Sequence, residues 1–282
     1  EAVERIAKPQ TGDENGPNGL GGWRFRNGYY TGSLGLAYRN EKKNGGVDEK
    51  GNIIKDKVDQ DGYSKPTGFP ANGILAATFN KELAYEAGRI IGNDGIWAGY
   101  SGIYGTGLNI HRSPYSGRTC EYFSEDGMLS GLMGAEESRG MESCGLHVYN
   151  KHCVLNDQEN NRHGIATWVT EQALREIYLR AFELPITKGG AYNTMASFNR
   201  LGTYSGAACK ELGTDFLRGE CGMKGIIVTD AYQDLDGNLG YDPYFEQAYG
   251  TLVGGSDIPD GAAPKNEKHF DKFETGYGEM AW

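Results

Sequence analysis

The sequence has no apolar run approaching the ~20 residues that a transmembrane helix needs. It is also short of positive charge, with 28 Lys and Arg residues against 38 Asp and Glu residues and a formal net charge of −10. An acidic chain of this kind is a poor match for nucleic acid or for an anionic membrane surface. We therefore expect no membrane span and no nucleic-acid partner, and a neutral substrate fits the charge well.

Cysteine is scarce and scattered, with no CxxC pair and no metal-finger spacing among the five residues. Such a set argues against a disulfide scaffold and favours a reducing, cytoplasmic compartment. The five histidines are equally dispersed and no HExxH motif is present, so we expect no metal site. Residues 102–107 lack both GxGxxG and the P-loop lysine, which argues against a nucleotide cofactor. The absence of GxSxG weakens an α/β-hydrolase interpretation.

What the sequence does contain is one short apolar run, Ile226, Ile227 and Val228, which follows a glycine and is closed by Thr229 and Asp230. An unalternating run of this length is typical of a strand buried on both faces of a parallel sheet. Such a strand delivers Asp230 to the carboxyl edge of the sheet, where ligands and catalytic groups collect in α/β folds. The alternative is that Asp230 only caps the next helix or turn.

Helical and extended patterns alternate along the chain. The predicted helices span 73–91, ending at Gly92–Gly95, then 126–139, a segment from Thr170 to just before Pro185, and 209–218. The first of them is expected to bury an apolar stripe that consists of Leu75, Phe79, Leu83, Ala87 and Ile90. The predicted strands span 107–110, 146–150, 192–198, 225–230 and 251–257. This alternation predicts a parallel sheet with right-handed crossovers.

For a chain of 282 residues we favour an α/β TIM-type (β/α)8 barrel, with a doubly wound open sheet as the second choice. Residues 1–72 are rich in turn formers and poor in strand patterns, so the barrel is expected to be incomplete or irregular. We interpret residues 1–282 as a single barrel-like catalytic domain in which 20–72 form a loop-rich excursion.

Polar side chains follow or end the predicted strands. They are Arg118, Lys151, His152, Met195 with Ser197, Asp230 and Asp257. In a parallel sheet these tips meet at one edge, and cations around a carboxylate can bind the hydroxyls of a neutral polyol and keep the carboxylate ionised. An ionised Asp on a pocket floor can attack an acetal carbon. The same cations could equally be solvated surface charges, and the histidines satisfied core residues, so a generic α/β enzyme remains open.

Several blocks, in order between residues 105 and 260, together resemble the signature of glycoside hydrolase family 3. They are 107–114, 117–118, 121–126, 151–159, 195–199, 217–220 and 222–230. The resemblance implies a barrel-like catalytic domain and retaining hydrolysis of β-glycosides, above all by an exo-acting β-glucosidase. Within the family, β-xylosidase and β-N-acetylglucosaminidase are the alternatives. A non-catalytic glycan-binding barrel is the alternative of another class.

By this resemblance Asp230 is the nucleophile that forms the glycosyl-enzyme. Arg118, Lys151 and His152 bind hydroxyls in the −1 subsite, and Met195 lines it. The Asp-Gly-Pro loop of the family corresponds here to Asn15-Gly16-Pro17, so its sugar contact is expected from Asn15 or from the nearby Asp13 or Glu14. The chain also departs from the family at Ala231, Phe198 and Cys153, which bears on substrate choice more than on reaction type.

The acid/base residue has no candidate in the sequence. Retaining hydrolysis needs a second carboxyl about 5–5.5 Å from the nucleophile, and in the family this group varies in position and often comes from a following domain. We therefore expect the chain to be part of a longer multi-domain enzyme, or to be completed by another subunit. Its expected partners are an oligosaccharide or β-glucoside and that second domain or subunit, with no cofactor.

Overall fold

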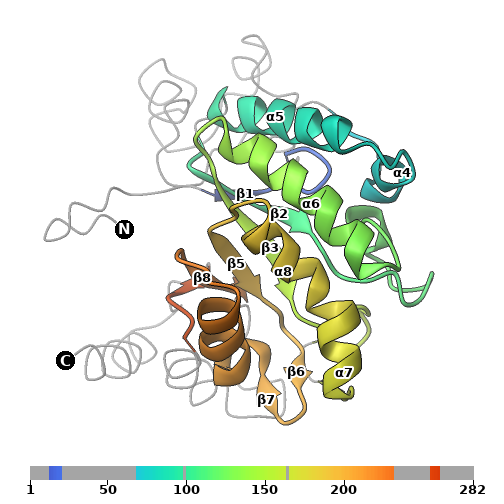
Figure 1. Ribbon diagram of the computed structural model, residues 1–282, viewed down its shortest axis with the longest axis vertical. Helices are drawn as coiled ribbons and strands as arrows, with labels where there is room; N and C mark the ends of the chain where they lie inside the picture. The colour runs from blue at the N-terminus through green and yellow to red at the C-terminus, as the bar shows by residue number, and fades with distance from the viewer. Residues whose placement is uncertain (1–12, 21–67, 98–99, 163–164, 232–254, 261–282) are drawn as a thin grey trace, which may run out of the picture.

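The computed structural model describes residues 13–20, 68–97, 100–162, 165–231 and 255–260 (Figure 1). Residues 21–67 of the predicted excursion lie outside these ranges. The main sheet has six parallel strands in the order β1-β2-β3-β5-β8-β9. They are β1 (Asp13–Asn15), β2 (Gly102–Gly107), β3 (His147–Cys153), β5 (Asn193–Ala196), β8 (Ile227–Ala231) and β9 (Ile258–Asp260).

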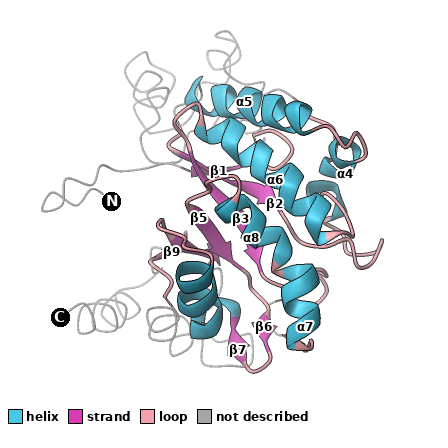
Figure 2. Ribbon diagram, in the orientation of Figure 1, coloured by secondary structure: helices cyan, strands magenta, loops and turns pink. Residues whose placement is uncertain are grey.

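The spatial order of these strands is also their order along the chain. Every crossover therefore steps in the same direction, whereas a doubly wound sheet reverses direction at a switch point. Helices α5, α6 and α8 accordingly lie across the same face of the sheet (Figure 2). This is the arrangement of a barrel wall, and among the described strands β1 and β9 are its two edges, so the ring is not closed there.

The helices lie between successive strands of the main sheet. They are α4 (Asn72–Ala76), α5 (Lys81–Trp97), α6 (Gly127–Glu142), α7 (Glu171–Ala173) and α8 (Arg180–Thr187), with the π-helical segments η3 (Leu174–Tyr178) and η5 (Glu211–Glu220) and the short 3-10 turns η2 (Thr119–Glu121) and η4 (Gly206–Ala208). A small second sheet contains β4 (Ala166–Thr167), β6 (Arg200–Leu201) and β7 (Tyr204–Ser205). Among the described residues, no helix combines the length and the apolar composition needed to cross a bilayer.

Side-chain caps begin several of the helices, α6 and α7 among them. The Asp126 carboxylate accepts hydrogen bonds from the backbone of Met128 and Leu129 at the start of α6. The Thr170 hydroxyl accepts one from Ala173 at the start of α7, as predicted. The helix that follows Thr170 does not stop before Pro185, because Pro185 lies inside α8 and is buried in its apolar face.

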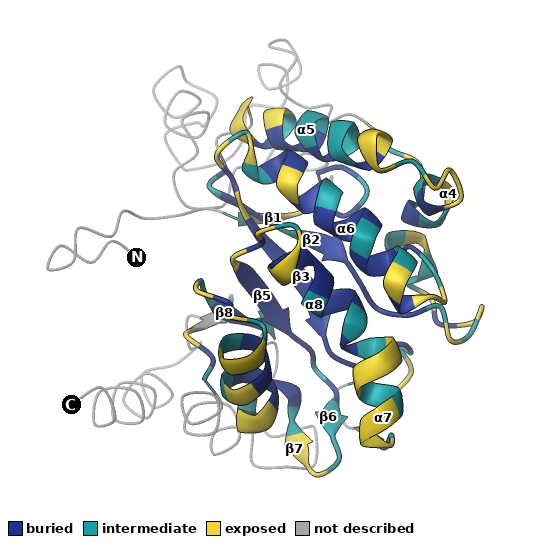
Figure 3. Cartoon of the chain, viewed as in Figure 1, coloured by how far each residue is buried: buried dark blue, intermediate teal, exposed yellow. Residues whose placement is uncertain are grey.

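The predicted helix 73–91 is wrong in both its continuity and its buried face. The chain breaks after α4, where Phe79 has a φ of 51° and is 75% exposed. A new helix then starts, with the Asn80 side chain accepting a hydrogen bond from Leu83. Figure 3 shows how far each part of α5 is buried, and its buried residues are mainly small. Gly92 and Gly95 lie within α5 and do not end it, because they face α6 and the sheet at close range.

Two predicted strands and one predicted loop are also corrected. The strand predicted at 107–110 lies earlier in the chain, as β2. Its glycines let neighbouring backbone come close, since a Cβ at Gly105 would lie 2.9 Å from the Pro17 nitrogen. Residues 13–15, predicted as loop, pair with β2 as strand β1. The last strand begins at Ile258 rather than ending at Asp257, and residues 251–254 lie outside the described ranges.

Candidate active site

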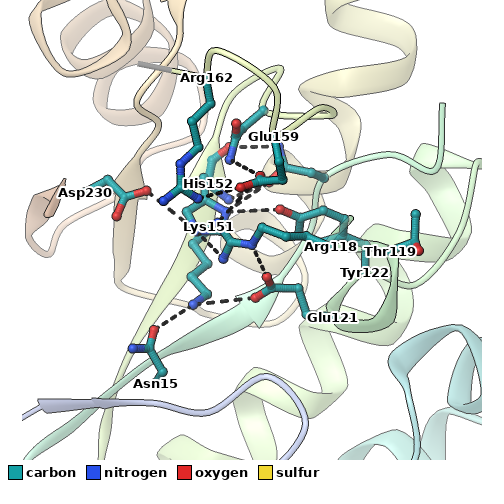
Figure 4. Close-up of polar contacts among 12 residues, drawn as sticks. Asn15, Arg118, Thr119, Glu121, Tyr122, Lys151, His152, Glu159, Arg162 and Asp230 are labelled. Atoms are coloured by element: carbon teal, nitrogen blue, oxygen red, sulfur yellow. Dashed lines mark hydrogen bonds and ion pairs between the residues drawn. The ribbon is translucent and has the colours of Figure 1, made fainter. Parts of the chain in front are cut away.

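A cavity of about 400 Å³ lies at the carboxyl edge of the main sheet. It takes side chains from β1, β2, β3, β5 and β8 and from the loops that follow β1, β2, β3 and β5. Figure 4 shows its polar side chains, from Asn15 to Asp230. The lining residues are Asn15, Pro17, Tyr104, Arg118, Glu121, Lys151, His152, Arg162, Met195, Phe198 and Asp230. The structure thus brings together residues that lie more than 200 positions apart in the sequence.

Strand β3 positions Lys151 and His152. The sequence predicts them beyond the strand end, but the strand runs on to Cys153 and buries both, each only 2% exposed. A buried ammonium needs partners, because desolvation is costly for an unpaired charge. Lys151 Nζ donates to Asn15 Oδ1 at 3.0 Å and lies 3.6 Å from Glu121 Oε2.

Arg118 makes contacts in three directions from the loop that follows β2. Its Nε donates to Glu121 Oε1, and its Nη1 lies 3.8 Å from Glu159 Oε1. Its Nη2 lies 2.9 Å from His152 Nε2. A guanidinium has no acceptor, so His152 Nε2 must accept this hydrogen bond.

His152 is consequently a neutral imidazole with its proton on Nδ1. Nδ1 lies 3.2 Å from Asn109 Oδ1 and 3.4 Å from the Tyr122 hydroxyl. Burial, together with the neighbouring Arg118 and Lys151 charges, holds the pKa of His152 well below its usual value. The ring presents Nε2 toward Asp230, whose Oδ2 is 3.7 Å away.

Glu121 and Lys151 each stabilise the charged form of the other. Burial acts to raise the pKa of Glu121, but the Lys151 ammonium and the Arg118 guanidinium outweigh it and hold that pKa below its usual value. Burial also lowers the pKa of Lys151, and Glu121 and Asp230 act against this shift. Glu121 is therefore an ionised carboxylate at neutral pH.

Asp230 reaches the cavity from β8. Because Thr194 pairs with Ile227 and Met195 with Val228, the register places Asp230 beyond Met195 at the carboxyl edge. Met195 is buried, packs beside Tyr149 and Val228, and lines the cavity wall.

Two other carboxylates lie elsewhere. Asp13 is at the start of β1, opposite Gly102, and is not among the cavity-lining residues. Asp257, predicted at the same edge as Asp230, lies instead at the opposite end of β8. There its carboxylate accepts from the Ile227 amide and pairs with Arg218, because the chain enters β9 only after this residue.

Four charged or aromatic residues of the wall had no role assigned from sequence. They are Tyr104, Glu121, Arg162 and Phe198. Arg162 Nη1 donates to Glu159 Oε2 at 2.6 Å, and its Cζ lies 4.7 Å from the centre of the Phe198 ring. Glu121 and Phe198 belong to signature blocks and could have been found there. No pattern marks Arg162, which lies in a polar loop. In the part of the chain that the structure describes, no group of three or more His, Cys, Asp or Glu could hold a metal ion.

A family model described as "Glycosyl hydrolase family 3 N terminal domain" matches residues 57–260. The chain is 38% identical over 173 residues to the β-glucosidase of Ruminococcus albus, covering 61% of this chain and 18% of that protein. It is 33% identical over 192 residues to β-glucosidase A of Butyrivibrio fibrisolvens, covering 68% of this chain and 22% of that protein. The chain thus spans about a fifth of the length of these curated relatives.

Solved structures resemble the chain along nearly its whole length. β-Glucosidase 3B of Thermotoga neapolitana in complex with α-D-glucose has a TM-score of 0.74 at 28% identity, covering 99% of this chain and 34% of that one. The β-glucosidase of Kluyveromyces marxianus has a TM-score of 0.75 at 25% identity, covering 99% of this chain and 28% of that one. The predicted α/β fold of TIM-barrel type is confirmed by this likeness.

Proposed function

This chain belongs to glycosyl hydrolase family 3, and on that premise we propose that its cavity hydrolyses β-linked glucosides with retention, through a covalent glycosyl-enzyme on Asp230. The observation that carries the proposal is the position of Asp230, which lies at the carboxyl edge of the sheet in a cavity lined by three cations. The named relatives are β-glucosidases, which favours glucose over xylose or N-acetylglucosamine as the sugar.

The cavity suits one neutral sugar ring. Its volume of about 400 Å³ is at the small end of the range for ligand sites, which favours an exo-acting enzyme. Arg118, Lys151 and Arg162 provide hydrogen-bond donors for hydroxyl groups, and the neutral His152 adds a ring nitrogen. Asn15 stands beside Lys151, where its amide can contact another hydroxyl.

Asp230 acts as the nucleophile in this proposal. Its carboxylate oxygen forms a bond to the anomeric carbon while the bond from that carbon to the aglycone oxygen breaks, and the departing oxygen takes a proton from an acid. Water then attacks the same carbon, gives its proton to the conjugate base of that acid, and releases Asp230. Two inversions give net retention.

The carboxylates in and beside the wall are poor candidates for the acid. Glu121 is kept ionised by Lys151 and Arg118, and Glu159 pairs with Arg162 and lies near Arg118. A general acid must be protonated at the working pH. We therefore place the acid/base carboxyl outside the described residues, in another domain or another subunit.

Replacing Asp230 tests the proposal. The D230N variant should hydrolyse an aryl β-glucoside at least about a thousandfold more slowly than the native protein, because the nucleophile is gone while the shape of the site is kept. D215N is the matched control, since Asp215 is exposed, pairs with Lys210 and is not among the cavity-lining residues. Initial rates on a panel of aryl glycosides would measure both effects and rank glucose against xylose and N-acetylglucosamine. Equal turnover by D230N and the native protein would contradict the proposal. Glucose binding with neither turnover nor a covalent adduct on Asp230 of the native protein would favour a glycan-binding barrel.

A further inference from the structure

Glu121 joins two cations of the cavity wall through one carboxylate. Its Oε1 accepts from Arg118 Nε, and its Oε2 lies 3.6 Å from Lys151 Nζ. The side chain is 13% exposed, so these contacts lie largely out of water and are screened little. The carboxylate thus fixes the spacing between Arg118, on the loop after β2, and Lys151, on β3.

The backbone of Glu121 is itself held in place. Its carbonyl oxygen accepts from Asn72 Nδ2 at 3.2 Å, and its amide donates to the Arg118 carbonyl at 3.1 Å. Gly107 lies against it so closely that any Cβ there would collide with the Glu121 carbonyl oxygen. The carboxylate is therefore presented from a fixed point on the wall.

Glu121 influences His152 through Arg118, which contacts both residues. Arg118 has one end on Glu121 and the other on His152 Nε2, at 2.9 Å. That hydrogen bond assigns the proton of His152 to Nδ1, and it depends on the direction in which the guanidinium points. Glu121 also acts on Lys151. Burial disfavours the charged form of Lys151, and the Glu121 carboxylate favours it.

We propose that Glu121 is the positioning residue of the −1 subsite, which sets the orientation of Arg118 and Lys151 and through Arg118 the tautomer of His152, so that all three face the sugar hydroxyls. The inference rests on the proposed function of the same cavity. Glu121 acts through its two cations and takes no part in bond making.

The E121Q variant separates this role from a merely structural one. The amide keeps the shape but loses the charge, so KM for an aryl β-glucoside should rise by about ten- to a hundredfold, with a smaller change in kcat. Lys151 would then face Arg118 and Asp230 without Glu121, which lowers its pKa, so the alkaline limb of kcat/KM should move to lower pH. E121D, which keeps the charge, should leave that limb near its native position even if KM rises.

E125Q is the matched control, because Glu125 is exposed on the same loop and does not line the cavity. It should behave as the native protein does in both KM and pH profile. A native-like KM and alkaline limb in E121Q would overturn the inference, as would a shift of the limb in E121D equal to that in E121Q.

Glucose affinity distinguishes failure of this inference from failure of the proposed function. If the native protein neither turns over the glucoside nor forms a covalent glycosyl-enzyme with it, the proposed function fails. The positioning role is then tested by titrating glucose into native protein, E121Q and E125Q. E121Q should bind glucose about tenfold or more weakly, and equal affinities of E121Q and the native protein would overturn the role of Glu121.

Discussion

At the scale of single residues, burial decides the protonation state of several groups, both in the cavity and away from it. Glu137 on α6 is 1% exposed, and burial raises its pKa to about 8 although it hydrogen-bonds the Thr106 side chain. It lies next to a buried hydrogen-bond network in which the Ser138 hydroxyl contacts Asn150 Oδ1 at 2.8 Å and Thr106 Oγ1 at 3.2 Å. The folded protein therefore holds Glu137 as a neutral acid at neutral pH.

The E137Q variant should remove a pH dependence of stability. In the unfolded chain Glu137 titrates near 4.5, and in the folded protein near 8. The folded state therefore binds the extra proton between these values, and the free energy of unfolding falls as pH rises through this window, by at most about 1.4 kcal/mol per pH unit. Gln mimics the neutral acid, so E137Q should lack this fall. Urea unfolding at pH 5, 6.5 and 8 measures the difference.

Glu142 also makes stability depend on pH, so E137Q must be compared with the native protein. Burial raises its pKa to about 7, so it contributes a fall of the same sign in both proteins, and only the difference between them reports on Glu137. Parallel curves of unfolding free energy against pH for E137Q and the native protein would contradict the assignment.

At the scale of elements, the packing of α5 on α6 depends on glycines that bring the two backbones together. A Cβ at Gly88 of α5 would overlap the Glu137 carbonyl oxygen, and one at Gly140 of α6 would overlap the Tyr85 carbonyl oxygen. Backbone cannot move aside as a flexible side chain can. While the two helices are packed this closely, only glycine fits at these positions. The same contact explains why the predicted apolar stripe failed, since the buried face of α5 is mostly small rather than large.

The G88A variant should destabilise the protein by about 1–3 kcal/mol, the usual cost of overpacking a tight contact. Midpoints of urea unfolding measure this change. G219A in η5 is the control, because an added Cβ there meets nothing closer than the Thr214 carbonyl oxygen at 3.5 Å. G219A should be neutral or stabilising by up to about 1 kcal/mol. Equal midpoints for G88A and the native protein would show that the helices can separate freely.

At the scale of the whole molecule, the alternation of strand and helix patterns was enough to predict a parallel α/β barrel wall. It also brought Arg118, Lys151, His152, Met195 and Asp230 to one edge, because parallel strands share a direction. Their exact placement in the strands was less predictable. The change from apolar to charged residues predicts that the strand ends before Lys151 and His152. Both lie within β3 instead, because Lys151 is paired with Glu121 and can therefore be buried.

Other features depend on contacts that a linear pattern does not contain. β1 consists of Asp, Glu and Asn and is a strand only because β2 pairs with it. Arg162 comes from a polar loop and reaches the wall through Phe198 and Glu159. Asp257 follows the same apolar-then-acidic pattern as Asp230, yet the chain enters β9 after it, so the carboxylate lies at the wrong end of the sheet.

The central claim is that Asp230 bonds covalently to the sugar. Its most direct test is to incubate the native protein with an activated 2-deoxy-2-fluoro glucoside, digest it, and locate the label by mass spectrometry. In such a reagent the second step is slowed, so the glycosyl-enzyme accumulates. The account predicts one added fluoroglucosyl group per molecule, on the peptide that contains Asp230. A label on any other residue, with Asp230 unmodified, would contradict it.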